Sequence, residues 1–281
     1  MAMKVAELPS LDKPRDRVEA PMTLAPARCN QVQHWCLMPE LVIFELVGTL
    51  VYDQGAIARF LTAACLRAGI AASLDDVESR WNFGHNIRSI LTIIALPRIA
   101  SLDSDRPISS IVQGIEEDFK ARIQHHLRTS SEAREIPGAT RALQTLHEAG
   151  VRVVLGSRLD LETCHCLMER FGWHQNHLVG DVLSLADEND ILEDSFLPAF
   201  PARTGWPLGM RETQIAKVCA TPLGVTSGRA ASCKWVIATL FNAQDETEFQ
   251  PHHPTHTISR LEDLAGVLFE RSQNCFHECK A

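Results

Sequence analysis

Three polar side chains of the sequence follow short apolar segments, which is where chemistry at the end of a strand is expected. Glu45 ends the apolar run 41–44, Thr49 follows shortly after it, and Ser157 comes after the apolar run 151–155. A carboxylate at such a position is a candidate general acid or base. Hydroxyl groups beside it are candidates to bind an anion or a carbonyl oxygen. We therefore take Glu45, Thr49 and Ser157 as the candidate catalytic residues.

Each of these residues also has a plainer interpretation. Glu45 fits equally well as a polar residue without a role at a strand end. If it faces an apolar crevice instead, desolvation favours its neutral acid, which can donate a proton or a hydrogen bond. Thr49 and Ser157 fit turn and strand-end hydrogen bonding as well as ligand binding. Both interpretations stay open from the sequence.

Further residues are expected to line the same crevice. Arg158 directly follows Ser157, and Cys219 follows a third apolar run, with a buried inert thiol as the plainer interpretation of that cysteine. Lys217 and Lys234 are expected at the surface. The segment 164–166 is Cys-His-Cys, and positions one or two apart do not share a helix face, so no metal site is expected there. The full set of candidate ligand-binding residues is Val47, Gly48, Trp81, Phe83, Arg158, Trp206, Cys219 and Thr221.

Alternating strands and helices must position these residues. The apolar runs that predict strands are 41–44, 151–155, 178–179, 215–218 and 235–237. Helical patterns lie between most of them, an alternation that is typical of βαβ units and a parallel sheet. In such sheets the functional crevice lies at the carboxyl ends of the strands. We expect an α/β fold, a Rossmann-like doubly wound parallel sheet with an inserted helical cap domain.

The same patterns predict how the chain is divided. Residues 1–39 carry four prolines and mixed charge, and are expected to form a partly disordered N-terminal extension. The segment 53–130 has helical spacing throughout, with Ser73 as an expected N-cap, and is predicted to be the cap. Residues 40–52 and 131–281 then form the core.

Composition narrows the class of function. The formal charge is −8, which argues against a generic binder of nucleic acid backbones, so no nucleic acid partner is expected. No membrane association is expected either, because no apolar run is long enough to span a bilayer. The nine cysteines are irregularly spaced and no signal peptide is recognisable, so we expect free thiols and a cytoplasmic location.

The segment 41–51 resembles the first motif of the haloacid dehalogenase superfamily, an apolar strand followed by Asp-x-Asp-Gly-Thr. The segments 136–150, 153–157 and 218–231 resemble later parts of that family in the same order. Two further segments, 84–87 and 205–207, resemble its phosphonatase-like branch. The resemblance covers 41–268 and implies a Rossmann-like core with a cap, as the strand pattern also predicts.

The departures from the family fall on its chemistry. The resemblance places Glu45 at the position of the attacking Asp and Val47 at that of the acid/base Asp. It places Ala220 and Gly224 where acidic residues hold Mg²⁺. The basic residue of the segment 205–207 is replaced by Trp206, and the cap lysine by Ile87, whereas Gly48, Thr49 and Ser157 match.

These replacements are expected to abolish Mg²⁺-dependent phosphoryl transfer. Glu extends its carboxylate by roughly 1.5 Å relative to Asp, and a misplacement of about 1 Å can cost about 10²-fold in rate. Valine cannot transfer a proton, which removes a further factor of about 10² to 10⁴. We expect that Mg²⁺ is lost and that no other cofactor is bound.

Three functions remain from the sequence. The first is a degenerate phosphatase that binds a small organic ligand in the core–cap cleft, or a protein partner. The second is a metal-independent isomerase, lyase or cyclase that uses Glu45 as its acid or base. The third, disfavoured, is a phosphatase or phosphonatase.

Overall fold

The computed structural model describes residues 38–99, 107–184, 214–241 and 245–269. Its main sheet has six parallel strands in the order β5-β4-β1-β6-β7-β8. The strands are β1 (Leu41–Glu45), β4 (Arg152–Ser157), β5 (Asp181–Ser184), β6 (Ile215–Cys219), β7 (Trp235–Thr239) and β8 (His256–Ile258). The predicted α/β, Rossmann-like parallel sheet is confirmed, although the strand expected at 178–179 begins at Asp181.

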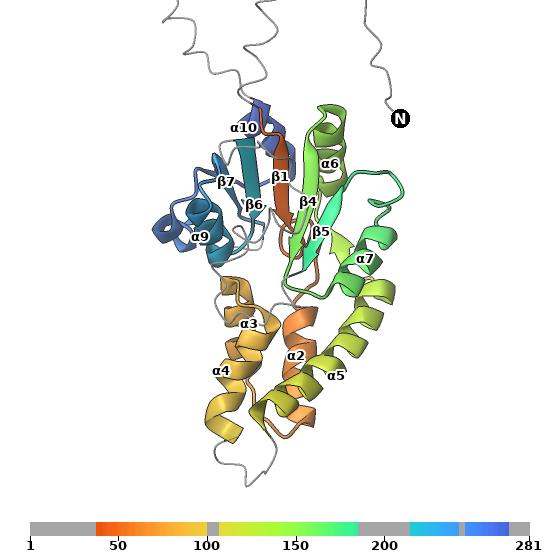
Figure 1. Ribbon diagram of the computed structural model, residues 1–281, viewed down its shortest axis with the longest axis vertical. Helices are drawn as coiled ribbons and strands as arrows, with labels where there is room; N and C mark the ends of the chain where they lie inside the picture. Colours follow the sequence, from red (N-terminus) through yellow and green to blue (C-terminus); the bar gives the residue numbers. More distant parts are fainter. Residues whose placement is uncertain (1–37, 100–106, 185–213, 242–244, 270–281) are drawn as a thin grey trace, which may run out of the picture. The chain divides into compact units, whose positions relative to one another are not determined.

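Helices cover both faces of this sheet (Figure 1). α9 (Pro222–Ala230) contacts β6 and β7, α6 (Ala139–Glu148) contacts β4, and α7 (Leu161–Arg170) contacts β5. α10 (Leu264–Phe269) packs on α6. Three short 3₁₀ helices, η3 (Glu246–Glu248), η4 (Gln250–His252) and η5 (Leu261–Asp263), complete the described core.

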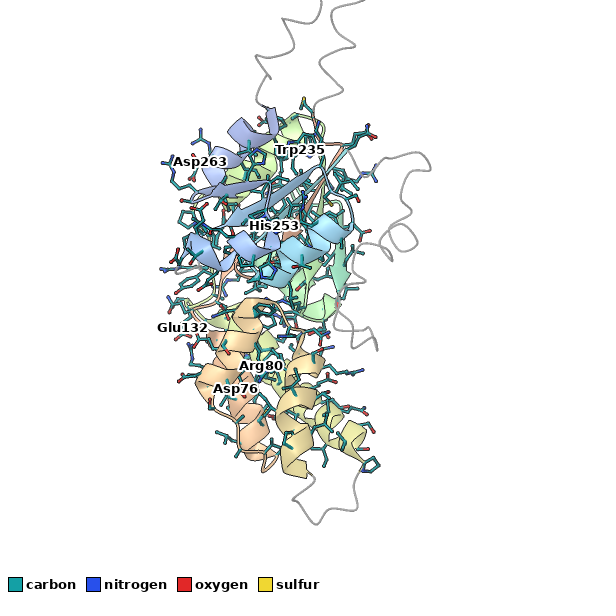
Figure 2. The ribbon with its side chains drawn as sticks, turned by 90° about the vertical axis from the view of Figure 1, so that its left-hand side faces the viewer. Asp76, Arg80, Glu132, Trp235, His253 and Asp263 are labelled. Atoms are coloured by element: carbon teal, nitrogen blue, oxygen red, sulfur yellow. The ribbon has the colours of Figure 1, made fainter. Side chains whose placement is uncertain are left out.

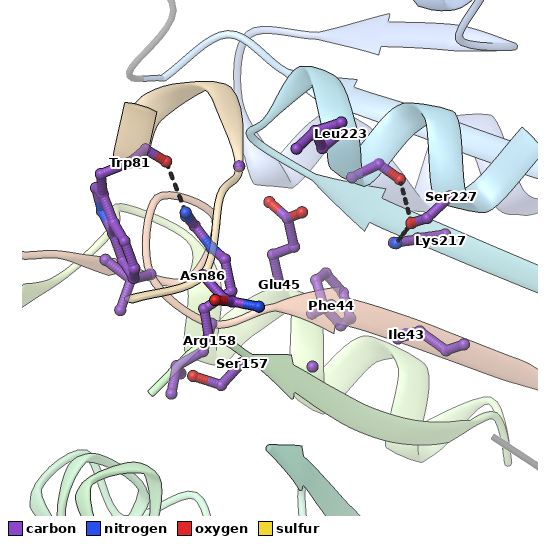
Figure 3. Close-up of a pocket in the computed structure, with 15 residues that line it drawn as sticks. Ile43, Phe44, Glu45, Trp81, Asn86, Ser157, Arg158, Lys217, Leu223 and Ser227 are labelled. Carbon is purple, nitrogen blue, oxygen red and sulfur yellow. Dashed lines mark hydrogen bonds between the residues drawn. The ribbon is translucent and has the colours of Figure 1, made fainter. Parts of the chain in front are cut away.

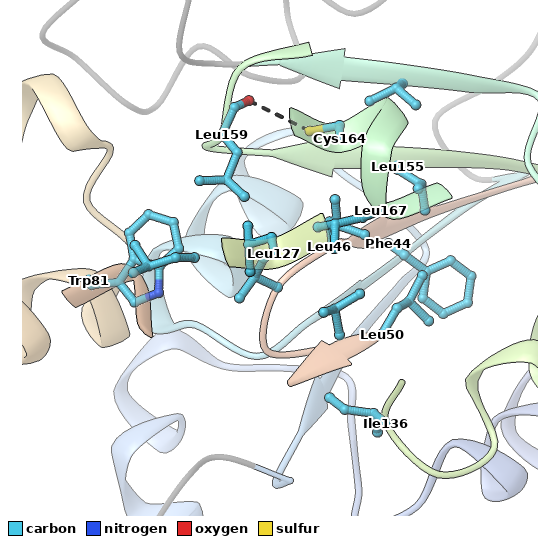
Figure 4. Close-up of a cluster of buried hydrophobic side chains, with 14 of the residues drawn as sticks. Phe44, Leu46, Leu50, Trp81, Leu127, Ile136, Leu155, Leu159, Cys164 and Leu167 are labelled. Atoms are coloured by element: carbon cyan, nitrogen blue, oxygen red, sulfur yellow. Dashed lines mark hydrogen bonds between the residues drawn. The ribbon is translucent and has the colours of Figure 1, made fainter. Parts of the chain in front are cut away.

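The alternation of side chains along β1 decides which residues face the site. Leu41 and Ile43 belong to the apolar cluster that includes Val225 of α9. Val42 and Phe44 belong to the larger cluster on the opposite face, part of which is drawn in Figure 4. Because side chains alternate along a strand, Glu45 follows Ile43 onto the α9 face.

The helical segment is an insertion between β1 and β4. It consists of α2 (Ala56–Arg67), α3 (Leu74–Phe83), α4 (Ile87–Ile99) and α5 (Ile108–Thr129), all within the segment predicted to be the cap. A two-stranded antiparallel ladder of β2 (Val51–Tyr52) and β3 (Arg134–Glu135) flanks the insertion. These helices lie beyond the carboxyl ends of the main strands, where the crevice was expected (Figure 1).

Local signals explain the ends of α3. Ser73 Oγ accepts a hydrogen bond from the N–H of Asp76 at 3.0 Å, which confirms the predicted N-cap. Asp76 and Arg80 form an ion pair along the helix at 3.1 Å (Figure 2). Gly84 ends the helix with φ of +122°, a backbone conformation that favours glycine. Within the described ranges, no helix combines the length and apolarity that crossing a bilayer requires.

Candidate ligand-binding site

Two hydrogen bonds hold the Glu45 side chain at the start of α9. Its Oε1 accepts from the hydroxyl of Thr221 at 2.8 Å, and its Oε2 accepts from the backbone N–H of Ala220 at 2.9 Å. Figure 3 shows the carboxylate extending from β1 toward α9. The amino end of a helix carries partial positive charge, which stabilises a carboxylate placed there. Both oxygens of Glu45 are therefore engaged by the core itself.

Gly224 makes this arrangement possible. Thr221 is the N-cap of α9, and its Oγ1 accepts the N–H of Gly224 at 3.1 Å while it donates to Glu45. A Cβ atom on Gly224 would overlap Oε1 of Glu45. It would also lie 2.8 Å from the Cβ of Cys219 and 2.8 Å from Oγ1 of Thr221. Position 224 cannot carry a side chain while Glu45 occupies this place.

The donor set here does not fit Mg²⁺. This ion takes near-octahedral oxygen ligands at about 2.0–2.1 Å, with carboxylates among them. The resemblance assigns acidic ligands to positions 220 and 224, where the chain has Ala220 and Gly224. The N–H of Ala220 points at Glu45, whose carboxylate fills the room that a side chain at 224 would need. No group of three or more His, Cys, Asp or Glu able to hold a metal ion occurs among the described residues.

Lys217 overturns one prediction. It was expected at the surface, but it lies in the middle of β6, beside Ile43 of β1, and only 4% of it is exposed. All of β6 is buried, so a lysine there has no solvent-facing side. Its Nζ donates to the hydroxyl of Ser227 on α9, and its stem passes under Gly228, where a Cβ would lie 3.2 Å from Lys217 Cδ. Lys234 is exposed, as predicted.

Glu45 and Lys217 line the same small cavity, whose volume is about 50 Å³. It lies where β1, β4, β6, α9 and the cap meet (Figure 3). The polar side chains that line it are Glu45, Asn86, Ser157, Arg158, Lys217 and Ser227. Apolar contacts come from side chains such as Ile43, Trp81 and Leu223.

A larger cleft of about 430 Å³ adjoins this cavity, and the two spaces share part of their walls. Trp81, Arg158 and Val47 line both spaces. The cleft brings together six of the predicted ligand-binding residues, from the cap and from the core, namely Val47, Gly48, Trp81, Phe83, Arg158 and Thr221.

Arg158 joins the core to the cap. It follows β4, and its Nη1 donates to the carbonyl oxygens of Trp81 at 2.6 Å and His85 at 3.0 Å. Its guanidinium carbon also lies 3.6 Å from the centroid of the Trp81 ring, a cation–π arrangement. A cation at the carboxyl end of α3 complements the helix dipole. Arg158 is thus a contact between domains as well as a wall of the cavity.

Gly84 forms a second close contact between cap and core. A Cβ there would lie 2.7 Å from the Cβ of Leu223 and 3.1 Å from Oγ1 of Thr221. The cap turn therefore rests directly on the first turn of α9. Gly84 and Arg158 both line the small cavity, so these two contacts between cap and core border it.

The hydroxyl groups that the sequence singled out lie in different surroundings. Ser157 is buried, lines the small cavity, and accepts the N–H of Leu159 at 3.1 Å through its Oγ. Thr49 is buried in the turn after β1, and its Oγ1 has no hydrogen-bond partner among the described residues. Thr49 lines neither of the two spaces described above.

Cys219 faces the core rather than the cavity. Its Sγ lies 3.7 Å from the carbonyl oxygen of Ile237, and the residue is fully buried. Burial and then the nearby charge of Glu45 raise the pKa of the Cys219 thiol well above its ordinary value. This is the plainer of the two interpretations that the sequence left open. The remaining candidate, Trp206, lies outside the described residues.

Sequence reasoning missed three contributors to the cavity. Asn86 is the residue before α4, and its Oδ1 accepts the N–H of Ser89 at 2.7 Å, so an N-cap signal was present. Lys217 is a charged residue inside an otherwise apolar strand. Ser227 lies on the sheet-facing side of α9, and nothing in its sequence neighbourhood distinguishes it from a surface serine.

Comparison with known proteins places this fold in a class. No family model matches the chain, and no curated protein matches it in sequence. Solved structures do match over most of its length, and they are haloacid dehalogenase-like hydrolases. The chain therefore has the haloacid dehalogenase-like fold, as its motifs predicted.

Three of these structures illustrate the extent of the similarity. A predicted phosphoglycolate phosphatase from Haemophilus somnus 129pt has a TM-score of 0.63 at 16% identity, covering 81% of this chain and 97% of that one. CbbY from Rhodobacter sphaeroides, in complex with phosphate, has a TM-score of 0.59 at 15% identity, covering 81% and 96%. A haloacid dehalogenase-like hydrolase from Streptococcus pneumoniae has a TM-score of 0.57 at 14% identity, covering 83% and 99%. At these identities the likeness concerns the fold, and the phosphonatase-like branch stays a prediction.

Proposed function

We propose that this chain binds a small organic ligand between core and cap and does not catalyse Mg²⁺-dependent phosphoryl transfer. The observation that carries the proposal is the position of Glu45. Its two oxygens are tied to Ala220 and Thr221, and it fills the space that a side chain at Gly224 would need. A nucleophile must be free to reach phosphorus in line, and a carboxylate held in this way is not.

The neighbouring positions support the same proposal. Val47 lines both the cavity and the cleft, where the family motif has a proton-transferring carboxylate. An aliphatic side chain there can contact a ligand but cannot protonate a leaving group. The polar groups of the cavity remain suited to binding, because Ser157 and Asn86 supply a hydroxyl and an amide beside apolar walls.

A second candidate is a metal-independent enzyme in which Glu45 is the acid or base. The observation in its favour is that Glu45 lines the small cavity together with Ser157. Proton transfer needs a substrate atom within about 3 Å of an oxygen of Glu45. The hydrogen bond from Thr221 would have to be exchanged for one to the substrate.

Phosphatase activity, which the names of the structural neighbours describe for those proteins, is the direct test. Phosphate release from a panel of phosphate monoesters and phosphonates is measured with and without Mg²⁺. The proteins are the wild type, Glu45→Ala, and Glu248→Ala as a control that removes an exposed carboxylate from the open cleft. We expect no release above the background of Glu45→Ala. Release that requires both Mg²⁺ and Glu45, and that survives in Glu248→Ala, would overturn the proposal.

A further inference from the structure

We propose that Glu132 and His126 form a pH-sensitive clamp at the two connections between cap and core, and that protonation of His126 tightens it. This inference rests on the proposed function, because it assigns regulation to the same core–cap site. It goes beyond that function, since neither residue lines the small cavity or the larger cleft.

The two connections between core and cap lie side by side. The first, 53–55, leads from β2 into α2, and the second, 130–133, leads from α5 into β3. β2 and β3 pair with each other, so both connections adjoin the same short ladder. A turn of the cap relative to the sheet has to be absorbed by the backbone angles of a few residues of this kind. We call these two connections the hinge.

Arg59 joins the two parts of the hinge. In the first part, Gln54 has a φ of +52° and Gly55 a φ of +71°. A residue with a side chain is strained in this left-handed region and keeps it only where its surroundings hold it. Arg59 of α2 donates through Nη1 to the carbonyl oxygen of Gln54 at 2.5 Å, and through Nη2 to Oε2 of Glu132 at 2.6 Å. Glu132 belongs to the second part, so one guanidinium bridges both connections.

His126 contacts the same oxygen of Glu132. It lies in the last turn of α5, and its Nε2 is 3.2 Å from Oε2 of Glu132. Nε2 is shielded from water and makes no well-aligned hydrogen bond to the described residues. The ring packs on Phe60 of α2, with 4.9 Å between the ring centroids. A neutral imidazole offers the carboxylate a lone pair or an uncharged N–H, whereas an imidazolium offers a charged N–H, which makes the stronger bond. The contact therefore gains strength when His126 takes up a proton.

Exposure distinguishes the two cations that contact Glu132. The side chains of Arg59 and Glu132 are 43% and 42% exposed, and ion pairs of this kind stabilise little. The side chain of His126 is only 17% exposed, so its charge is screened less by salt and water. Protonation of His126 therefore adds the better shielded of the two contacts to Glu132.

Other charged groups near His126 are engaged elsewhere. Arg122 lies one turn earlier on α5 and is paired with Asp118. α7 also packs on α5, and its Arg170 donates to backbone carbonyl oxygens around the end of α5. Within the described ranges, Glu132 is the acidic side chain that His126 contacts. Histidine is the side chain whose charge ordinarily changes closest to neutral pH, which sets the range in which the clamp is to be tested.

The hinge bears on the ligand site through the walls of the larger cleft. Trp81 and Phe83 line the cleft from the cap, and Thr221 and Pro222 line it from the core. A turn about the hinge moves the first pair relative to the second. A tighter hinge consequently keeps the two walls in place around a ligand.

The experiment is amide hydrogen exchange of the full chain without ligand at about pH 6 and about pH 8, on either side of the range in which histidine ordinarily titrates. Exchange times are adjusted for the intrinsic pH dependence of exchange. We expect the hinge and the cap turn 84–87 of the wild type to be about two- to fivefold better protected at the lower pH, in line with the strength of a partly exposed ion pair.

Three variants assign this difference to the clamp. His126→Phe keeps a ring on Phe60 and should lose the pH difference. Glu132→Gln keeps an oxygen for Arg59 without the charge, and should lose the difference as well. His125→Phe replaces the exposed histidine next to His126 and should keep the difference.

Each contrary result has a definite meaning. Equal protection at both pH values in the wild type, or the same pH difference in a folded His126→Phe, would overturn the clamp. A difference of equal size in the strands of the main sheet would overturn it as well, because global stability would then have changed. A difference in the hinge that does not extend to the cap turn would overturn regulation of the site. If His126→Phe does not fold, as judged by near-ultraviolet circular dichroism, Glu132→Gln decides in its place. These measurements need neither a ligand nor phosphate release, so the phosphate-release assay tests the proposed function separately.

Discussion

Glu45 and Gly224 occupy one space between the central strand and α9. The carboxylate of Glu45 reaches the helix at the point where the Cβ of any side chain on residue 224 would lie. Glu45 can therefore hold this position only because residue 224 is a glycine. The carboxylate cannot move aside without breaking the hydrogen bonds that Ala220 and Thr221 donate to it.

This dependence is measurable as an interaction energy. We expect Gly224→Ala to lower the free energy of unfolding by about 1–3 kcal/mol, as overpacking of a buried site does. In the background of Glu45→Ala the same change should cost less, by about 0.5–3 kcal/mol, because one of the overlapping groups is gone. Urea unfolding of the two single variants and the double variant gives both values. Strict additivity would mean that Glu45 does not fill the space at residue 224. Cys219 and Thr221, each 2.8 Å from the added Cβ, should leave some residual cost.

Thr221 connects Glu45 to the helix, so its hydroxyl should matter more than its methyl group. Thr221→Val removes the N-cap acceptor for Gly224 and the donor to Glu45, and is expected to cost at least about 1–2 kcal/mol of stability. Thr221→Ser keeps the hydroxyl and should recover most of this loss. Urea unfolding curves of the two variants test the expectation. An equal loss in both would assign the effect to packing instead of hydrogen bonding.

Arg158 should control how tightly the cap turn is held. Removing its guanidinium in Arg158→Met breaks the hydrogen bonds to Trp81 and His85 and the stacking on the Trp81 ring. We expect amide hydrogen exchange in the segment 84–87 to accelerate by at least about tenfold, since each bond to a charged donor is worth roughly 1.5–3 kcal/mol. Exchange in the sheet should stay unchanged.

The matched control for this experiment is Arg80→Met. Arg80 pairs with Asp76 on α3 itself, so its loss removes a guanidinium from the same helix without touching the core contact. Similar acceleration in both variants would show that α3 is loosened locally and that Arg158 does not hold the cap.

Cys219 should make the free energy of unfolding decrease at alkaline pH. Burial, followed by the charge of Glu45, raises the pKa of its thiol, so the native state keeps this proton when the unfolded chain has lost it. In the unfolded chain a cysteine thiol has a pKa of about 8.5. Above that pH the native state binds more protons than the unfolded state, and stability falls as the pH rises. Below that pH the contribution of the Cys219 thiol to stability is fully present.

The measurement compares the wild type with Cys219→Ala. Urea unfolding at pH 7 and at about pH 10, beyond the unfolded thiol pKa of roughly 8.5, should show a smaller alkaline loss in the variant. Native Cys219 should also resist alkylation by iodoacetamide until the chain unfolds. Rapid labelling of Cys219 in the native protein would contradict its placement in the core.

The sequence predicted the sheet better than it predicted the site. β1 before its final Glu45, and β6 apart from Lys217, consist of apolar residues, as is typical of buried parallel strands, and both were predicted. In a strand that is buried on both faces, apolar and polar residues do not alternate, so the sequence does not show which face of the sheet each side chain lies on. For this reason Lys217 could not be assigned to the α9 face until the register of β6 against β1 was known. The sequence placed Thr221 in the same crevice as Glu45, but it did not predict the hydrogen bonds that Thr221 and Ala220 donate to the Glu45 carboxylate.

The position of β1 also governs when the sheet can form. β1 ends at residue 45, but its two neighbours in the sheet are β4 and β6, which begin at Arg152 and Ile215. The cap helices contact one another within 56–129, so they can pack before either neighbour of β1 has been synthesised. During translation an apolar strand is thus exposed for more than a hundred residues of synthesis, a state in which chains are prone to aggregate. We therefore expect the inserted segment to fold before the sheet during synthesis, and we expect the need for chaperones to rise when the segment between β1 and β6 is lengthened.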